Sequence, residues 1–152
     1  MSRSGYCDDM DDQWSFIRWR GAVKSAIRGK RGQSFLREMI EAMDALPERK
    51  LVANELQSGD QVCAIGAVGK SRGIDMGQID PEDYATVAAL FGISDALAQE
   101  IVFMNDEAWI WSTDERGIQK DAQGKSIRLT PEQRFEKMRS WVSRHLKDPV
   151  QS

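Results

Sequence analysis

The stretch CAIGAVGKSRG, residues 63–73, ends with Gly69, Lys70 and Ser71, the residue types that close a phosphate-binding loop. In the pattern G-x-x-x-x-G-K-S/T, backbone amides and a lysine surround nucleotide phosphates. The position five residues before Gly69 holds Ala64 instead of glycine. Such a loop must also open into a helix whose first amides bind the phosphates, but RGIDMGQIDP follows Ser71, with two glycines and a proline. We therefore expect no nucleotide site here.

We interpret the same stretch as a packing helix from about Val62 to Arg72. Gly66 and Gly69 fall on one side of that helix, and Gly73 is placed to end it in a left-handed cap. Two interior glycines cost roughly 1 kcal/mol each relative to alanine. We therefore expect Gly66 and Gly69 to face a neighbouring helix that approaches closely.

Other catalytic chemistry has little support in the residue types. The single histidine, His145, lies on an apolar helical arc, and no serine or cysteine is placed near it by sequence, so a histidine-activated nucleophile is not indicated. Cys7 and Cys63 stand in unrelated contexts, which favours buried or unpaired thiols in a reducing cytoplasm. Two cysteines and one histidine are too few for a cysteine-rich or histidine-rich metal centre. We expect no catalytic residue, no metal and no cofactor.

Charge is segregated along the chain. Residues 13–37 hold seven bases and no acid, whereas residues 1–12 sum to −3 and residues 38–152 to −7. The bases are interleaved with three aromatic residues, Trp14, Phe16 and Trp19. Such a patch attracts nucleic acid or the acidic surface of a partner. Alternatively, the bases pair with acids of the chain itself, such as Asp8 to Asp12 or the outer face of the following helix.

Helical spacing puts Arg20, Lys24 and Arg28 on one stripe, at i, i+4 and i+8, beside an apolar face. The segment RGKRGQ, residues 28–33, then carries two more bases between glycines that we expect to break the helix. We predict that five bases form the contact surface with a partner: Arg20, Lys24, Arg28, Lys30 and Arg31.

The elements that position these residues are mainly helical. Residues 13–28 have the period of an amphipathic helix, and a second helix from about Ser34 to Leu46 is stopped by Pro47. A short connector joins the two helices, so we expect them to pack as a hairpin. Residues 51–62 are either a small β-hairpin turning at 58–60 or a loop.

Further helices follow in the second half of the chain. Asp80 is placed as an N-cap with a proline after it, and this helix should end at Gly92. Ser94 should cap the next helix, which reaches about Met104. Residues 105–129 are polar and interrupted by glycine, so we interpret them as a long loop around Trp109-Ile110-Trp111. Thr130-Pro131-Glu132-Gln133 is a capping box that begins the last helix.

The segment 87–101 resembles a DNA-binding helix-turn-helix, with Ala88, Gly92 and Ile93 at the spacing of that family. In that motif the second helix enters the major groove and reads base edges with residues such as arginine, lysine, asparagine or glutamine. Here the second helix offers only Gln99, beside carboxylates that repel phosphates. We expect two packed helices and no DNA-reading element.

Length and composition are those of one globular domain. The chain has 152 residues, of which 41% are hydrophobic and 30% charged, with a net charge of −3. No apolar run approaches the ~18 residues of a membrane span, and the polar, acidic segment 1–12 does not resemble a signal peptide. We predict a mainly α, compact single-domain helical bundle over 1–152, with the small β-hairpin as the one alternative element.

Several longer stretches are similar to a group of small proteins encoded by phages and prophages: SRSGYCDD, RWRGAVKSAIRGKRGQSFLREMIEAMDALP, VCAIGAVGKSRGIDM and FMNDE. The similarity spans roughly residues 2–107 and again TPEQRFEKMRSWV, and the run RWRGAV…RGKRGQ is its most specific part. Residues 108–129 depart from the pattern. The resemblance implies a mobile-element protein in a bacterial cytoplasm and supplies no catalytic residue.

From these observations we expect a non-enzymatic interaction protein, such as an anti-CRISPR-like inhibitor of a bacterial defence complex. Its partner would be a host protein or ribonucleoprotein complex, with nucleic acid as a further candidate and no membrane. Defence complexes carry bound nucleic acid, which a basic patch can reach, and basic channels, which an acidic surface can occupy. The alternative is a nucleic-acid-binding regulator that uses the helix-turn-helix-like segment.

Overall fold

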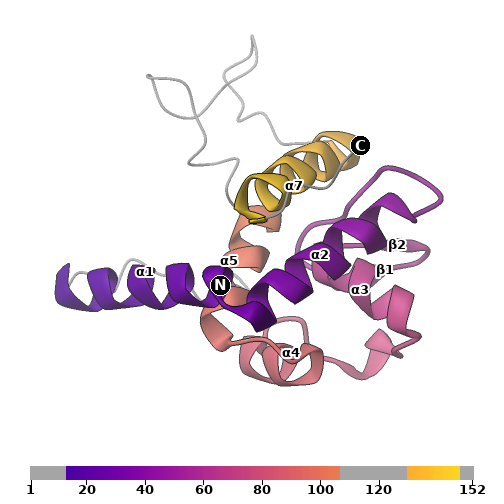
Figure 1. Ribbon diagram of the computed structural model, residues 1–152. Coiled ribbons are helices and arrows are strands. Elements are labelled where there is room, and N and C mark those ends of the chain that lie inside the picture. Colours follow the sequence, from indigo (N-terminus) through magenta and orange to yellow (C-terminus); the bar gives the residue numbers. More distant parts are fainter. Residues whose placement is uncertain (1–12, 107–129, 148–152) are drawn as a thin grey trace, which may run out of the picture.

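The computed structural model describes residues 13–106 and 130–147, and the structural account is confined to them (Figure 1). The described residues form six α-helices, one 3-10 turn and one two-stranded hairpin. In chain order these elements are α1 (Gln13–Arg28), α2 (Lys30–Asp44), β1 (Gln57–Ser58), β2 (Gln61–Val62), α3 (Ala64–Arg72), η1 (Met76–Gln78), α4 (Tyr84–Phe91), α5 (Asp95–Asp106) and α7 (Pro131–His145). The predicted mainly helical single domain is confirmed, and so is its small hairpin.

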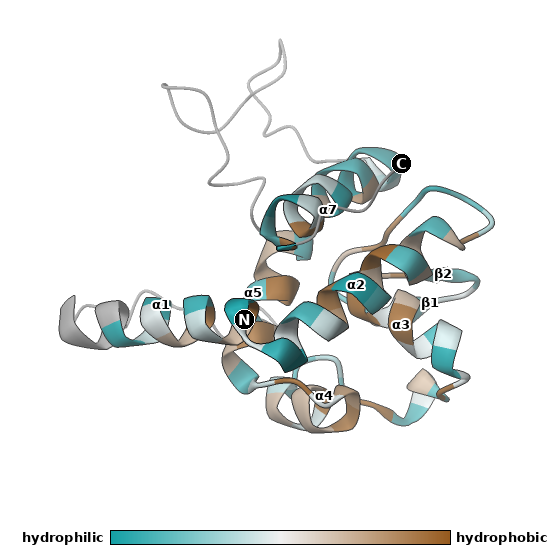
Figure 2. Cartoon of the chain, viewed as in Figure 1, coloured by the Kyte–Doolittle hydropathy of each residue, from teal (hydrophilic) through white to brown (hydrophobic). Residues whose placement is uncertain are grey.

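Helix α2 lies between α3 on one side and α7 on the other, while α5 contacts α1, α3, α4 and α7 (Figure 1). The core is built where these helices face one another. Figure 2 shows the strongly hydrophobic residues on α3, α5 and the inner side of α2, and hydrophilic residues on the outer sides of α2 and α7. The largest fully buried side chains include Phe135, Leu36, Met39, Ile65 and Ile101.

Helices α1 and α2 do not form the predicted hairpin. Figure 1 shows α1 projecting to one side of the molecule and α2 continuing toward the other, so the two helices are not antiparallel. The apolar side chains of the C-terminal half of α1, such as Val23 and Ile27, are buried in the core. Helix α1 packs on α5, and α2 instead runs antiparallel to α7, because Gln33 contacts His145 at one end and Asp44 contacts Arg139 nearer the other.

Helix α3 confirms the interpretation of the glycine-rich stretch as a packing helix. Cys63 is its N-cap, with its sulfur accepting from the amide of Gly66 at 3.3 Å, and Gly73 ends it with φ 72° in the left-handed region. A Cβ at Gly69 would contact the side chains of Met76 and Phe91, the latter on α4. A Cβ at Gly66 would instead collide with the backbone carbonyl of Leu56. The close neighbour of Gly66 is therefore the segment before β1, not a helix.

The predicted start of α4 is wrong for a local reason. Helix α4 begins at Tyr84 with Asp83 as its N-cap, and the Asp83 carboxylate accepts from the amide of Thr86 at 3.2 Å. Asp80 instead closes a turn, in which its carboxylate accepts from the amide of Glu82 at 2.9 Å. The predicted caps at Gly92 and Ser94 are confirmed, and Thr130 and Gln133 form the predicted capping box of α7.

The C-terminal end of α5 is a buried polar cluster that the sequence analysis had assigned to a loop. The Asn105 side-chain amide donates to the carbonyl of Val52 at 2.9 Å, and its oxygen accepts from the amide of Ala64 at 3.2 Å. The guanidinium of Arg134 donates to the carbonyl of Asn105 at 2.8 Å. These bonds join the segment before the hairpin, α3 and α7 to α5. The remainder of the predicted loop, with Trp109 and Trp111, lies outside the described residues.

No single helix in the described ranges has the length and apolar character needed to cross a membrane. Helices α4 and α5 meet that criterion only when taken together, and they are bent by 109°.

Candidate basic interface

The predicted contact residues lie around a sharp break between α1 and α2. Gly29 is the single residue between the helices and has an extended conformation, with φ −67° and ψ 160°. Gly32 lies inside α2 and is buried, and a Cβ there would collide with the backbone carbonyl of Ala26. The prediction that both glycines break the helix is therefore correct for Gly29 and wrong for Gly32, where the missing side chain lets α1 and α2 approach closely.

As a result, Lys30 and Arg31 occupy the first turn of α2 and are not in a loop. This turn contains no acidic residue, and its N-cap, Gly29, provides no side-chain hydrogen bond. The N-terminus of a helix carries a partial positive charge, so a cation there is unfavourable by about 0.3–1 kcal/mol. The electrostatics of α2 alone would favour acids at these two positions.

The side chain of Gln33, in α2, joins the start of this helix to the C-terminal ends of α1 and α7. Its Nε2 donates to the carbonyl of Ile27 at 2.7 Å, near the end of α1, and to the carbonyl of His145 at 2.9 Å, at the end of α7. Its Oε1 accepts from the backbone amide of Lys147 at 2.9 Å. Both amide protons and the oxygen are thus engaged. A neutral side chain holds α1, α2 and α7 together at this point.

This junction brings cations from three helices to one region of the surface. We define the basic face as six exposed residues: Lys24 and Arg28 of α1, Lys30 and Arg31 of α2, and Arg144 and Lys147 at the end of α7. Within residues 13–106 and 130–147, none of the six forms an ion pair. The segments that contribute them, 13–37 and 137–147, contain no acid.

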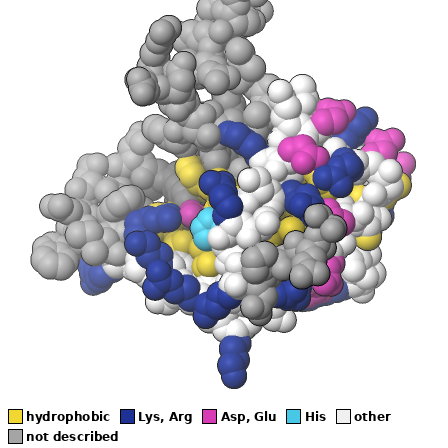
Figure 3. All heavy atoms as spheres, turned by 45° about the horizontal axis from the view of Figure 1, so that its top comes forward, with side chains coloured by type: hydrophobic (Ala, Val, Ile, Leu, Met, Phe, Trp, Pro, Cys, Tyr) yellow, Lys and Arg dark blue, Asp and Glu magenta, His cyan; other side chains and the backbone are white. Residues whose placement is uncertain are grey.

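The sign of charge differs across the surface. Figure 3 shows one side of the view dark blue with little magenta, and the other side with Asp and Glu beside Lys and Arg. Close to the basic face, burial lowers the pKa of the Lys137 ammonium, and the charge of Arg144 lowers it further. The like charges on α7 therefore repel one another, with no acid in residues 137–147 to offset them.

Arg20, the remaining predicted contact residue, forms an ion pair within the protein. Its guanidinium donates to both carboxylate oxygens of Glu100 on α5, each at 3.1 Å. The Glu100 side chain is 7% exposed, and a carboxylate at that depth requires a charged partner. The internal pairing that the sequence analysis kept open is thus observed for Arg20, with an acid on α5 and not one from α2. We therefore leave Arg20 out of the basic face.

A cavity of about 220 Å³ lies beside Lys30 and Arg31. It separates the break between α1 and α2 from the turn between α4 and α5, and its lining includes the hydroxyl-bearing Ser25 and Ser94. The Ser94 hydroxyl oxygen accepts from the amide of Leu97 at 3.1 Å. Its proton is not used in that bond.

The sequence analysis did not identify Arg144 and Lys147 as contact residues. They lie more than a hundred positions from Lys30 and Arg31, and no local period links the two segments. The one available signal was compositional. The eleven residues 137–147 carry bases and no acid, as residues 13–37 do. The Gln33 bonds, together with the packing of α2 on α7, bring the two segments together.

Of the other residues that the sequence analysis considered, Lys70, Ser71 and Cys63 lie outside the basic face, whereas His145 joins the junction through its backbone carbonyl. Lys70 and Ser71 lie in the last turn of α3, so no helix N-terminus follows them as a phosphate loop requires. Cys63 is buried at the start of α3. The Nδ1 of His145 lies 2.7 Å from the carbonyl of Trp141. Cys7 lies outside the described residues.

The helix-turn-helix-like segment has the angle of that motif and lacks its exposed second helix. Helices α4 and α5 meet at 109°, within the range of about 90–120° for such motifs. However, Gln99 and Asn105, the two residues of base-reading type on α5, are only 9% and 1% exposed, and Glu100 is also buried. Helix α1 packs on α5 and covers part of its surface.

The chain matches no known family model, and searches of curated proteins and of solved structures also returned no match. Among the described residues, no group of three or more His, Cys, Asp or Glu is arranged to hold a metal ion.

Proposed function

We propose that this protein is a non-enzymatic interaction protein that docks through the basic face onto an anionic surface of a larger partner. The partner that we propose is a bacterial defence complex, a host protein or ribonucleoprotein, which this phage or mobile-element protein would inhibit in the manner of an anti-CRISPR. The most specific part of the resemblance to phage proteins, RWRGAV…RGKRGQ, includes the break between α1 and α2 and carries most of the basic face.

One observation carries the proposal, namely the two cations in the uncapped first turn of α2. Arg28 and Arg144 lie in the last turns of their helices, where a cation is favoured by the helix dipole, so their placement has a structural explanation. Lys30 and Arg31 have the opposite effect on their helix. Residues that violate a local rule without structural benefit are expected at functional sites, and an anionic partner supplies the missing counter-charge.

The alternative function, a nucleic-acid-binding regulator, is supported by the 109° angle between α4 and α5. The burial of Gln99 removes its base-reading group from the surface. A regulator of this kind would have to use another surface of the protein.

The proposal is tested by measuring defence in living cells. Bacteria carrying an active CRISPR system are transformed with a targeted plasmid, with and without the protein. We expect the native protein to restore transformation, and the variant Lys30→Gln/Arg31→Gln to have lost most of this effect.

The matched control is Lys50→Gln/Lys70→Gln, which removes the same charge outside the basic face. Lys50 pairs with Glu48 at 3.2 Å in an exposed ion pair that contributes little to stability, and Lys70 is exposed at the end of α3. We expect this variant to act like the native protein. Equal restoration by all three proteins, or none by the native protein against a panel of defence systems, would contradict the proposal.

A further inference from the structure

We infer that the anionic group recognised by the basic face is the phosphodiester backbone of a nucleic acid, bound without strong sequence preference. The inference rests on the proposed function in using the same surface. It adds the chemistry of the partner, which charge segregation alone leaves open between nucleic acid and acidic protein.

The first argument is the composition of the face. Protein–protein interfaces have an apolar, often aromatic centre from which charged residues are depleted. Protein–nucleic acid interfaces are more polar and much more positive. The basic face consists of six charged residues, and the one large hydrophobic side chain that is exposed within the described ranges, Leu90, lies on α4 and not on the helices that form the face. Among the described residues, the face therefore has cations and no large exposed hydrophobic side chain.

The second argument is the range of donors beside the cations. Phosphate oxygens accept hydrogen bonds from Lys, Arg and Ser/Thr side chains and from backbone amides. The cavity of about 220 Å³ beside Lys30 and Arg31 is lined by Ser25 and Ser94 as well as by these two bases. Ammonium, guanidinium and hydroxyl donors thus line one opening, and no acid is among the described residues that line it.

The third argument explains the low sequence preference. Asparagine and glutamine read adenine through two hydrogen bonds from one side chain. Gln33, at the junction of the three helices, already uses both of its protons and its oxygen to hold the three helix ends. Gln99 is buried in α5. These two amides are therefore not available to read adenine. The arginines and lysines of the face can read guanine as well as contact phosphate, and phosphate contacts do not specify sequence, so we expect affinity with at most a weak preference for guanine.

The test is fluorescence anisotropy with labelled single-stranded RNA, single-stranded DNA and duplex DNA of mixed sequence. Binding is measured between about 50 and 200 mM salt, because each neutralised phosphate adds roughly −0.7 to −0.9 to the slope of log K against log salt. With six cations we expect a slope of about −4 to −5 and less than a few-fold difference between sequences.

The variants separate the basic face from general charge. Lys30→Gln/Arg31→Gln should reduce the steepness of the slope by about two, because each lost phosphate contact removes roughly one. Lys50→Gln/Lys70→Gln, with the same net charge, should bind like the native protein. Circular dichroism melting curves of all three proteins confirm that each is folded. Equal loss of binding in the two variants would overturn the inference.

Poly-glutamate serves as the probe for an acidic protein surface. We expect it to compete with RNA much less well than an equal concentration of charge supplied as unlabelled RNA. Equal competition, or no nucleic acid binding at about 50 mM salt, would overturn the phosphate assignment. If the protein blocks plasmid interference but fails this test, the proposed function stands and its partner surface is protein. If it binds nucleic acid but leaves interference unaffected, the inference stands and the proposed function fails.

Discussion

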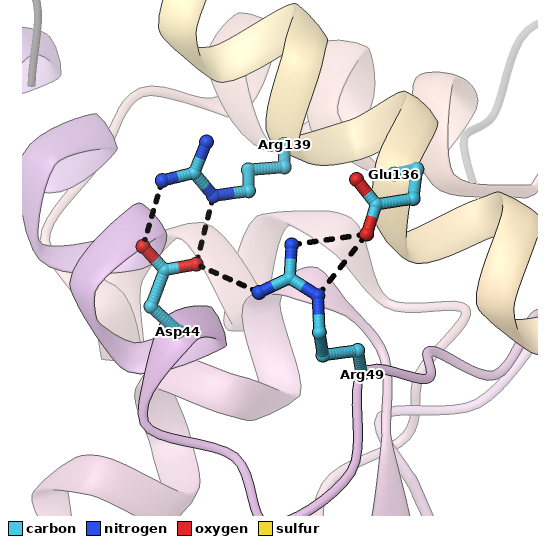
Figure 4. A network of polar contacts seen from close by, with 4 residues as sticks. All are labelled: Asp44, Arg49, Glu136 and Arg139. Atoms are coloured by element: carbon cyan, nitrogen blue, oxygen red, sulfur yellow. Dashed lines mark hydrogen bonds and ion pairs between the residues drawn. The ribbon is translucent and has the colours of Figure 1, made fainter. Parts of the chain in front are cut away.

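The two ends of the α2–α7 pair are held together by different chemistry. At the C-terminal end of α2, the Asp44 carboxylate accepts from the Arg139 guanidinium at 2.8 and 3.0 Å (Figure 4). Arg49 bridges the same carboxylate, at 3.9 Å, and that of Glu136, at 2.9 Å. We call these four residues the paired end. At the other end the contact is made by neutral Gln33, and the cations around it form no ion pair within the described residues.

The difference shows that cations are used in two ways on one pair of helices. At the paired end, two arginines and two acids neutralise one another, and Arg49 also lies over the ring of Phe135 at 4.5 Å. At the basic face, an amide performs the structural task, so the charges of Lys30 and Arg31 remain exposed to solvent. A helix contact made by hydrogen bonds to a neutral group leaves nearby charges available for a partner.

The largest expected effect concerns the backbone contact that positions the basic face. In Gly32→Ala the new Cβ collides with the carbonyl of Ala26, which is backbone and has little freedom to move. We expect a loss of about 3 kcal/mol in the free energy of unfolding, at the upper end of overpacking effects. Urea denaturation measures this change. The matched control is Gly21→Ala, where no atom lies within 4 Å and alanine should stabilise α1 by up to about 1 kcal/mol. Equal stability of the two variants would contradict the close approach at Gly32.

The next largest effect is expected from removing the Gln33 side-chain amide, which joins the three helix ends. Gln33→Leu loses three hydrogen bonds and leaves the carbonyls of Ile27 and His145 without this donor. We expect about 1–2 kcal/mol of destabilisation, together with faster hydrogen exchange at the amide of Lys147. Gln57→Leu is the control, because Gln57 makes only a local, exposed bond to Gly59 at 3.1 Å. If both variants melt at the native temperature, Gln33 does not hold the junction.

The paired end and the basic face can be compared directly with two arginines of the same helix. Arg139→Gln breaks the two-bond contact with Asp44 and should cost about 1 kcal/mol, since Arg139 belongs to a network of charges. Arg144→Gln removes an exposed arginine of the basic face and should change stability by about 0–0.5 kcal/mol. Thermal melting of both variants measures the two losses of stability. A larger loss in Arg144→Gln would reverse the assignment of paired and unpaired ends.

A pH dependence is expected from another paired acid of α2. Arg72 donates to Glu38 at 2.7 and 2.8 Å, and these hydrogen bonds lower the pKa of Glu38 below its ordinary value of 4.5. Because the folded-state pKa is depressed, the stabilisation is present above pH 4.5 and is lost as the pH falls through the folded pKa. The effect is small because the side chain is 36% exposed. Unfolding free energies between neutral and acidic pH should fall less steeply for Glu38→Gln than for the native protein, and parallel curves would refute the coupling.

The smallest effect has the opposite sign. Lys30→Glu replaces a cation with an anion in the first turn of α2, where the helix dipole favours negative charge. We expect a gain of about 0.3–1 kcal/mol in stability together with loss of partner binding. A melting curve and a binding assay on the same variant measure both quantities. Lower stability would mean that Lys30 has a structural role in the folded protein. Lys30 would then resemble the arginines of the paired end and would not be a cation left available for a partner.

Much of the fold follows from local signals. The period of 13–28, the capping box at Thr130 and the left-handed glycine caps at Gly73 and Gly92 depend on residues within a few positions of one another. The wrong start of α4 depended on competition between equivalent local choices. Both Asp80 and Asp83 can cap a helix, and the chain uses Asp80 for a turn and Asp83 for the cap.

The sequence by itself determined that the protein is mainly helical and that its positive charge is concentrated in one segment, because helical period and charge are properties of neighbouring residues. Only the tertiary structure decided which bases are available. Arg20 is paired with Glu100, eighty positions away, and Arg144 and Lys147 join Lys30 and Arg31 through bonds that Gln33 makes across more than a hundred positions. The physical reason is that ion pairing and exposure depend on distances between helices, and the packing of Gly32 and Gln33 sets those distances in three dimensions.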